Sequence, residues 1–217
     1  MHIPDGFVTV PVAGAGIAVS AGCVAYAVKA TNKKLGEKQV PLMGVLAAFI
    51  FAAQMLNFPI AGGTSGHVLG AALAAVLLGP WAGILVMTCV LVVQSLIFQD
   101  GGLLALGVNV LNMGVVGCLA SYYIYRGVFL LSRGSRTGVL LGGGIAAWFS
   151  VVIAATMAAL ELAISGTVPY GVALLAMAGV HALIGIGEAL ITTAVLSLIL
   201  ATRVDLLKLQ KAEGGNT

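Results

Sequence analysis

The sequence has little charge. Only 8% of its 217 residues are Asp, Glu, Lys or Arg, whereas a soluble domain carries about 25%. Hydrophobic residues make up 60%, and the mean hydropathy is +1.13. So few charges cannot cover a water-exposed surface, which excludes an ordinary soluble protein. The composition predicts an integral membrane protein, and the net charge of +3 gives no reason to expect a nucleic-acid partner.

Cysteine is also scarce. Cys23, Cys89 and Cys118 lie singly in three different apolar stretches, and no CxxC spacing occurs. We therefore expect buried apolar side chains with no role in a disulfide or a metal site. Linkers and low-complexity segments are missing as well, so residues 1–217 are expected to form a single membrane domain.

Long apolar stretches dominate what is present. A bilayer core of about 30 Å needs a helix of about 20 residues. Seven candidate spans are found, at residues 8–30, 41–57, 66–79, 80–98, 103–125, 137–165 and 172–202. They predict an all-α, polytopic bundle of seven transmembrane helices. The third is short and follows NFPIAGGTSG, a composition that favours irregular backbone, tolerated at membrane depth only where protein or a water-lined cavity satisfies it.

The basic residues predict the orientation. All ten follow the first, fifth or seventh predicted span, at Lys29, Lys33, Lys34, Lys38, Arg126, Arg133, Arg136, Arg203, Lys208 and Lys211. With seven spans they share one side of the membrane. Since Lys and Arg are enriched in cytoplasmic loops, we expect the N-terminus outside and the C-terminus in the cytoplasm.

The N-terminal MHIPDG does not resemble the basic leader of a cleaved signal peptide. We expect Met1 to be retained, because methionine aminopeptidase requires a small second residue. A free amine, the amide nitrogen of His2 and the His2 Nδ1 can then chelate one ion through a five-membered and a six-membered ring. A square plane of nitrogens indicates Ni(II) or Cu(II). His67 is the other histidine on the outer side and can supply the fourth nitrogen.

Other residues are candidates for supporting this site. Thr64 and Ser65 are suited to cap the third span, and glycines at 62, 63 and 66 allow a tight turn that brings His67 towards the N-terminus. A carboxylate commonly orients a ligand imidazole from behind. Asp5, Ser65 and Asp100 are the candidates for such positioning roles. A histidine at position 2 is usually incidental, and a histidine after Ser-Gly at a helix start is more often a hydrogen-bonding core residue than a ligand. The motif alone therefore leaves the metal site and these simpler interpretations open.

Three ionisable residues lie within predicted spans: Glu161, His181 and Glu188. Such groups are costly in a bilayer and often functional, so a proton-coupled or ion-coupled secondary transporter is one alternative. Interhelical hydrogen bonding that locks the bundle is the reading we favour. Small residues at Gly14, Ala18 and Gly22 permit close helix approach, either within the bundle or to a partner subunit.

An enzymatic alternative is a rhomboid-like intramembrane serine protease. The stretch GTSG contains Ser65 in a GxSG pattern, and His181 is available as a base. The motif is short and no further protease motif occurs, so this reading carries little weight.

Four motifs together resemble the CbiM/NikM family, the substrate-binding S components of energy-coupling-factor transporters for cobalt and nickel. They are MHIPDG at the terminus, NFPIAGGTSGHVLG at 57–70, FQDGGLLALGVNVLNMG at 98–114 and HALIGIGEALIT at 181–192. The resemblance covers nearly the whole chain. It implies that the metal is held by the Met1 amine, the His2 amide and imidazole, and His67.

The resemblance also implies partners: a transmembrane T component, two ATP-binding cassette ATPases and a small accessory membrane subunit. The chain contains no G-x-x-x-x-G-K-[ST] motif, so ATP hydrolysis is expected on another polypeptide and no resident cofactor is expected. MHIPDG is more similar to the nickel branch than to the cobalt branch. Ni(II) is thus the expected substrate, with a cobalt-specific component for cobalamin biosynthesis as the alternative. The expected location is the plasma membrane of a prokaryote.

Overall fold

The computed structural model describes residues 1–33, 36, 39–60 and 64–207. Lys34, Lys38, Lys208, Lys211, Gly62 and Gly63, which entered the predictions above, lie outside the described residues. Its elements, in order, are α1 (Val10–Asn32), α2 (Gln39–Gln54), β1 (Phe58–Ile60), β2 (Thr64–Gly66), α3 (Ala71–Leu78), α4 (Pro80–Ile97), α5 (Leu106–Asn109), the π-helical turn η1 (Val110–Val116), α6 (Gly117–Leu131), α7 (Arg136–Ile164), α8 (Tyr170–Leu174), the π-helical turn η2 (Leu175–Gly179) and α9 (Val180–Thr202).

The seven predicted spans all contain helix, and the chain is mostly helical, as expected. Five helical segments are long and apolar enough to cross a membrane in the described part of the chain. They are α1, α4, the continuous segment α5–η1–α6, α7, and the continuous segment α8–η2–α9. The stretch at 41–57 gives only the 16-residue helix α2. The multi-pass membrane character of the chain therefore follows from its helices.

The third predicted span is much shorter than expected. α3 has eight residues, which rise about 12 Å and cannot cross a bilayer alone. All eight are buried, because α3 packs against α4, α6 and α7 inside the bundle. Its uniform hydrophobicity thus reflects burial in protein on every side. Gly79, with a φ of 82°, ends α3, and Pro80 begins α4 at once.

The segment between α2 and α3 is irregular, as its Gly and Pro content predicted. β1 and β2 pair antiparallel, with Pro59 opposite Ser65. The expected capping role of Thr64 and Ser65 is wrong: both lie in β2, and α3 is preceded by Gly70 with a φ of 79°. Pairing in the hairpin satisfies the backbone of these residues and overrides their local preference for a helix cap.

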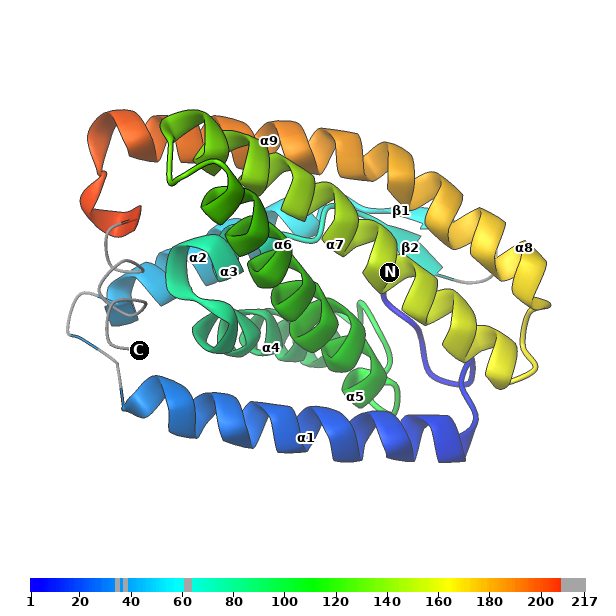
Figure 1. The fold of residues 1–217 in the computed structure, drawn as a ribbon. Helices are drawn as coiled ribbons and strands as arrows, with labels where there is room; N and C mark the ends of the chain where they lie inside the picture. The colour runs from blue at the N-terminus through cyan, green and yellow to red at the C-terminus, as the bar shows by residue number, and fades with distance from the viewer. Residues whose placement is uncertain (34–35, 37–38, 61–63, 208–217) are drawn as a thin grey trace.

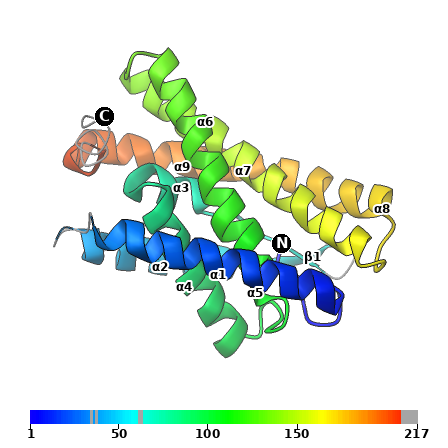
Figure 2. The same cartoon turned by 60° about the horizontal axis from the view of Figure 1, so that its bottom comes forward.

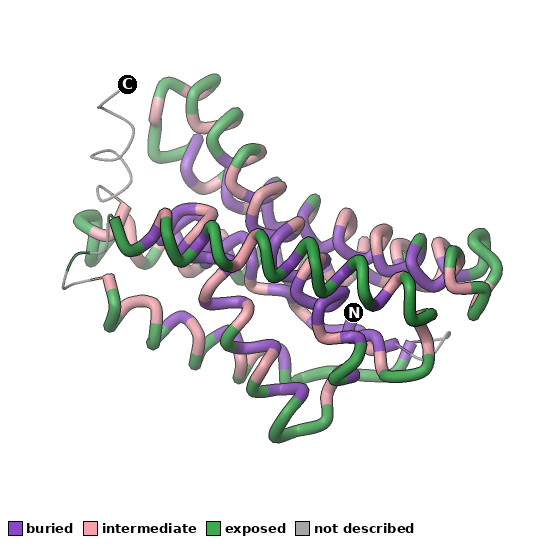
Figure 3. Tube along the Cα trace, turned by 90° about the horizontal axis from the view of Figure 1, so that it is seen from below, coloured by how far each residue is buried: buried purple, intermediate pink, exposed green. Residues whose placement is uncertain are grey.

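The helices surround the N-terminal segment, and α1 lies along one side of the bundle (Figure 1, Figure 2). Much of α1 is exposed, whereas α3, inside the bundle, is buried (Figure 3). Gly16 makes the close approach of α1 to the bundle, since an added Cβ there would lie 2.9 Å from the backbone nitrogen of Val108. Gly14 and Gly22 have nothing within 4 Å of an added Cβ. The small-residue stripe therefore does not serve internal packing, and contact with a partner subunit stays a prediction.

Candidate metal centre

The first residues of the chain are inserted into the bundle, and buried contacts hold them there. Met1 and Ile3 are 1% and 0% exposed. The Ile3 amide donates to Asn109 Oδ1 at 2.9 Å, and Asn109 Nδ2 donates back to the Ile3 carbonyl at 3.0 Å. The Gly102 amide donates to the same carbonyl at 3.0 Å. These bonds fix the backbone on the far side of His2 from the terminus.

Asp5 anchors the same segment to the loop after α4. Its carboxylate accepts hydrogen bonds from the backbone amides of Leu103, Leu104 and Ala105, at 3.0, 2.8 and 3.1 Å. The contact with an imidazole suggested by the sequence is not among its bonds. Gly102 lets the two segments meet, because an added Cβ would overlap the backbone nitrogen of Asp5. Asp5 thus positions the N-terminal segment as a whole.

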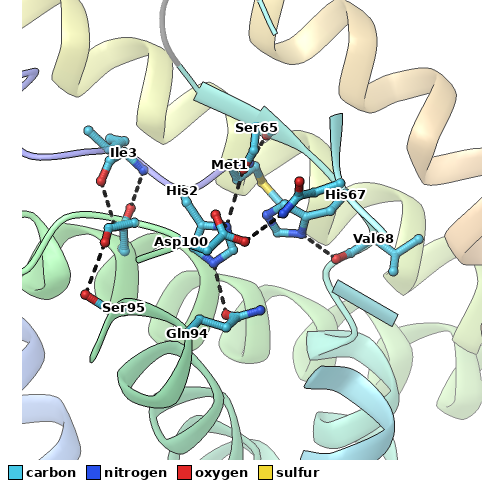
Figure 4. A network of polar contacts seen from close by, with 12 residues as sticks. Met1, His2, Ile3, Ser65, His67, Val68, Gln94, Ser95 and Asp100 are labelled. Carbon is cyan, nitrogen blue, oxygen red and sulfur yellow. Dashed lines mark hydrogen bonds and ion pairs between the residues drawn. The ribbon is translucent and has the colours of Figure 1, made fainter. Parts of the chain in front are cut away.

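The terminal amine and the imidazole of His2 share one neighbour, Ser65 on β2. The amine donates to the Ser65 carbonyl, and Ser65 Oγ lies 3.3 Å from the amine nitrogen and 3.4 Å from His2 Nδ1. Asp100 Oδ1 lies 3.3 Å from the same Nδ1, and Asn57 Nδ2 donates to the other Asp100 oxygen at 2.7 Å. The amine and Nδ1 therefore lie on the same side of the segment (Figure 4).

Hydrogen bonds select the tautomers of both outer histidines. His2 Nε2 lies 3.0 Å from Gln94 Oε1, an acceptor closer than Asp100 Oδ1 is to Nδ1, which favours the proton on Nε2 and the lone pair on Nδ1. His67 Nδ1 lies 2.7 Å from the Val68 carbonyl, so its Nε2 keeps the lone pair. That Nε2 is buried and has no hydrogen-bond partner. The two rings stack with centroids 4.5 Å apart and an interplanar angle of 28°.

Burial keeps these nitrogens neutral. It lowers the pKa of the Met1 amine from 8.0 to about 4, against a smaller opposing effect of Asp100. It lowers the pKa of His2 from 6.5 to about 3, assisted by the positive charge of the amine and opposed by the bond to Gln94. Burial likewise holds the pKa of His67 well below its usual value. The pKa of Asp100 is raised above its usual value, and burial of the carboxylate is the main cause. Free lone pairs are what a transition metal requires of nitrogen ligands.

Side chains alone do not make a metal site here. Among the described residues, no three His, Cys, Asp or Glu side chains are grouped to hold an ion. The convergence of Met1, His2 and His67 fits a metal only if the terminal amine and the main-chain amide count as donors, as the chelate argument expects. Gln94 and Asn109 were missed by that argument. Their signal in the sequence is an uncharged polar residue within an apolar span, which favours a buried partner.

The ionisable residues within the spans make structural bonds. Glu188 accepts the amides of Leu69 at 2.5 Å and Gly70 at 2.7 Å, and Glu161 accepts Asn112 Nδ2 at 2.5 Å. The Glu161 bond joins α7 to η1 and fits the interhelical locking that we favoured, whereas Glu188 ties α9 to the segment before α3. Ser65 contacts the terminal amine and His2, whereas the Nδ1 of His181 lies 2.7 Å from the Met177 carbonyl. The geometry therefore gives no support to a Ser65–His181 catalytic pair.

Comparison with known proteins gives consistent matches over nearly the whole chain. Residues 2–206 match the family model CbiM, described as the cobalt uptake substrate-specific transmembrane region. A candidate fused nickel transport protein, NikMN, of Archaeoglobus fulgidus is 43% identical over 99% of this chain and 70% of its own. The cobalt transport protein CbiM 1 of Pelobacter propionicus is 34% identical over 92% of this chain and 91% of its own.

A solved structure supports the fold. A truncated transition metal transporter superposes with a TM-score of 0.85 at 35% identity, covering 93% of this chain and 99% of its own. The relatives are transport proteins rather than enzymes, which agrees with the expected non-enzymatic role. The names of the relatives include both nickel and cobalt, so they leave the choice of ion open.

Proposed function

The chain belongs to the CbiM family of cobalt and nickel uptake proteins of the prokaryotic plasma membrane, and from that premise we propose that it is the substrate-capturing S component of an energy-coupling-factor importer. It binds one Ni(II), or alternatively Co(II), in a plane of four nitrogens. These are the Met1 amine, the His2 amide, His2 Nδ1 and His67 Nε2. Partner subunits supply the ATP hydrolysis: a T component, two ATPases and a small accessory membrane protein.

One observation carries the proposal: His67 Nε2 is a buried nitrogen with a lone pair and no hydrogen-bond partner. The ring of His2 stacks beside it, and the bond from His2 Nε2 to Gln94 favours a lone pair on His2 Nδ1 as well. An unpaired acceptor in a buried place is unfavourable unless a ligand fills it. The neutral amine supplies a third nitrogen at the same place. A planar nitrogen set favours Ni(II) over Co(II), and the general order of affinities runs the same way.

The seven-span topology is part of the proposal. Lys33, Arg133, Arg136 and Arg203 lie at or beyond helix ends that the predicted topology assigns to the cytoplasm. With the N-terminus outside, the nitrogen site lies on the side of the membrane that faces the medium from which the metal is captured. Residues 1–217 then act as one domain that captures the ion, and release to the cytoplasm is driven from the partner subunits.

The test compares three purified full-length proteins with free N-termini. The native chain is expected to bind one Ni(II) with a square-planar, diamagnetic spectrum. Inserting two leucines between Met1 and His2 keeps every native side chain, and the bulky second residue keeps Met1 in place. The insertion moves the amine too far from the imidazole for their fused chelate rings, so binding should be lost. The control carries the same insertion between Gly6 and Phe7, outside the chelate, and should bind as the native chain does.

Equal binding by the Met1–His2 insertion would contradict the site while leaving the family intact. Competition between Ni(II) and Co(II) for the native chain then decides the substrate. A preference for Ni(II) supports the nickel assignment, and a preference for Co(II) supports the cobalt alternative. Failure of the native chain to bind either ion would contradict the proposed function.

A further inference from the structure

His181 on α9 has the same unusual state as His67. It is 0% exposed, its Nδ1 lies 2.7 Å from a carbonyl of its own helix, and its Nε2 is buried without a hydrogen-bond partner. Its nitrogen lone pair thus has no role in the packing of the helices. The nitrogen plane proposed above does not use it either.

Hydrogen bonds at two places fix the segment that carries His67 against the helical segment that carries His181. At one end, Thr64 Oγ1 donates to the sulfur of Met177 at 2.8 Å. At the other end, the amides of Leu69 and Gly70 donate to the carboxylate of Glu188. β2 also contacts α9 directly. Thr64 precedes Leu69 as Met177 precedes Glu188, so the segment and the helix run in the same direction and the segment lies along the helix.

The spacing of these anchors places both histidines between the same two anchoring points. Met177 and Glu188 are about 16 Å apart along a helix, and the five residue steps from Thr64 to Leu69 can reach about that far when extended. His67 lies between the segment's anchors, and His181 lies between the helix's anchors, one turn after Met177.

We infer that His67 and His181 form a second, weaker coordination position for a divalent transition-metal ion, next to the outer nitrogen plane. The inference rests on the proposed function, because the ion that reaches this position is the ion captured by Met1 and His2. His67 belongs to both positions. An ion can therefore exchange its N-terminal ligands for His181 without losing its bond to His67, which is a physical basis for a first step inward.

Neutral imidazoles suit this role, since Nε2 is a common ligand atom for Ni(II), Co(II) and Zn(II). Both rings are already fixed through Nδ1 to a backbone carbonyl, the arrangement that orients metal-ligating histidines. Two protein ligands hold an ion less tightly than four. The position is therefore suited to transit, and the outer plane to capture.

The experiment uses Ni(II) chloride alone with purified full-length chains in detergent, each released from a cleavable N-terminal fusion so that it begins with Met1. In the native background, His181→Ala should keep one Ni(II) per chain and the square-planar spectrum. The His2→Ala chain lacks the outer imidazole and should bind Ni(II) weakly through His67 and His181. Adding His181→Ala to it should weaken that binding on the order of tenfold or more. X-ray absorption should show two imidazoles on nickel in His2→Ala and one in the double variant.

Two further variants distinguish ligation from folding. His2→Ala with His181→Cys should recover binding, because a thiolate replaces the imidazole as a ligand. His2→Ala with Thr192→Ala, which changes another buried residue of α9, should bind like His2→Ala alone. Equal Ni(II) binding with and without His181, or a single imidazole on nickel in His2→Ala, would overturn this inference and leave the proposed function standing. A native chain that binds no metal would overturn the proposed function itself.

Discussion

His2 and Gln94 are joined by a buried hydrogen bond, with His2 Nε2 3.0 Å from Gln94 Oε1. The two residues come from the N-terminal segment and from α4, 92 positions apart. The bond leaves the Nδ1 lone pair of His2 available on the side of the terminal amine. The orientation of the proposed ligand thus depends on a residue that does not touch the metal.

We expect Gln94→Leu to weaken Ni(II) binding by roughly 10- to 100-fold, the usual cost of removing a partner that orients a metal-ligating histidine. Calorimetric titration of the purified chain measures the affinity. Thr88→Ala is the matched control, because Thr88 lies on the same helix and its hydroxyl bonds only to the Ile84 carbonyl of its own turn. An unchanged affinity in Gln94→Leu would mean that the His2 tautomer is set in some other way.

Gly102→Ala should unseat the N-terminal segment. Its added Cβ would overlap the backbone nitrogen and carboxylate of Asp5, which hold that segment to the loop after α4. Overpacking of this kind costs about 1–3 kcal/mol, which corresponds to roughly tenfold or more in Ni(II) affinity if docking is required for binding. Gly171→Ala is the control, since nothing lies within 4 Å of its added Cβ. Equal loss in both variants would point to a general effect on the fold.

Metal binding at neutral pH should release about one proton per ion, from the His2 amide. The docked amine and the His2 imidazole have pKa values of about 4 and about 3, so both are already neutral near pH 7. Calorimetry in buffers of different ionisation enthalpy gives the number of protons released. Release of two or more would show that the amine is charged before the metal binds.

The same lowered pKa values predict how docking of the N-terminal segment depends on pH. Undocked, the amine and His2 take up protons below their usual pKa values of 8.0 and 6.5, whereas the docked groups do so only near 4 and 3. The undocked state therefore binds more protons between about pH 3 and 8, and docking strengthens as pH rises through this range. Hydrogen exchange, corrected for intrinsic rates and referenced to α7, should show protection of residues 1–6 rising with pH. Protection that is constant over this range would contradict the prediction.

Glu188→Gln should lower the thermal stability of the bundle. The carboxylate accepts two buried backbone amides, and an amide side chain has one oxygen, so one N–H loses its acceptor. We expect a cost of about 1–3 kcal/mol, read as a lower melting temperature in detergent. Glu161→Gln is the comparison and should cost less, because Asn112 can still pair with the new side chain.

Glu188→Gln also tests the secondary-transporter alternative. In the assembled importer, the variant should lose stability while metal uptake still requires the ATPase partners. Uptake that is abolished by this substitution but needs no ATPase would favour a coupling role for Glu188.

The sequence by itself determined the helical membrane character of the chain, because apolar stretches of helix length are a local property that needs no knowledge of neighbours. It also identified Met1, His2 and His67 as candidate ligands, since chelate chemistry depends on adjacent atoms and His67 is the other histidine on the predicted outer side. In contrast, local preference failed at Thr64 and Ser65, where strand pairing overrode helix capping.

Only the tertiary structure decided the contacts between distant residues. It paired His2 with Gln94 and Ile3 with Asn109, and it buried all of α3 within the bundle. It left Gly14 facing away while Gly16 approached Val108. Such pairings depend on how whole helices pack, and no short-range pattern encodes which face of one helix meets another. The sequence near each ligand thus determines which donor atoms it offers. The convergence of the ligands, their tautomers and their neutral state depend on burial in the folded bundle.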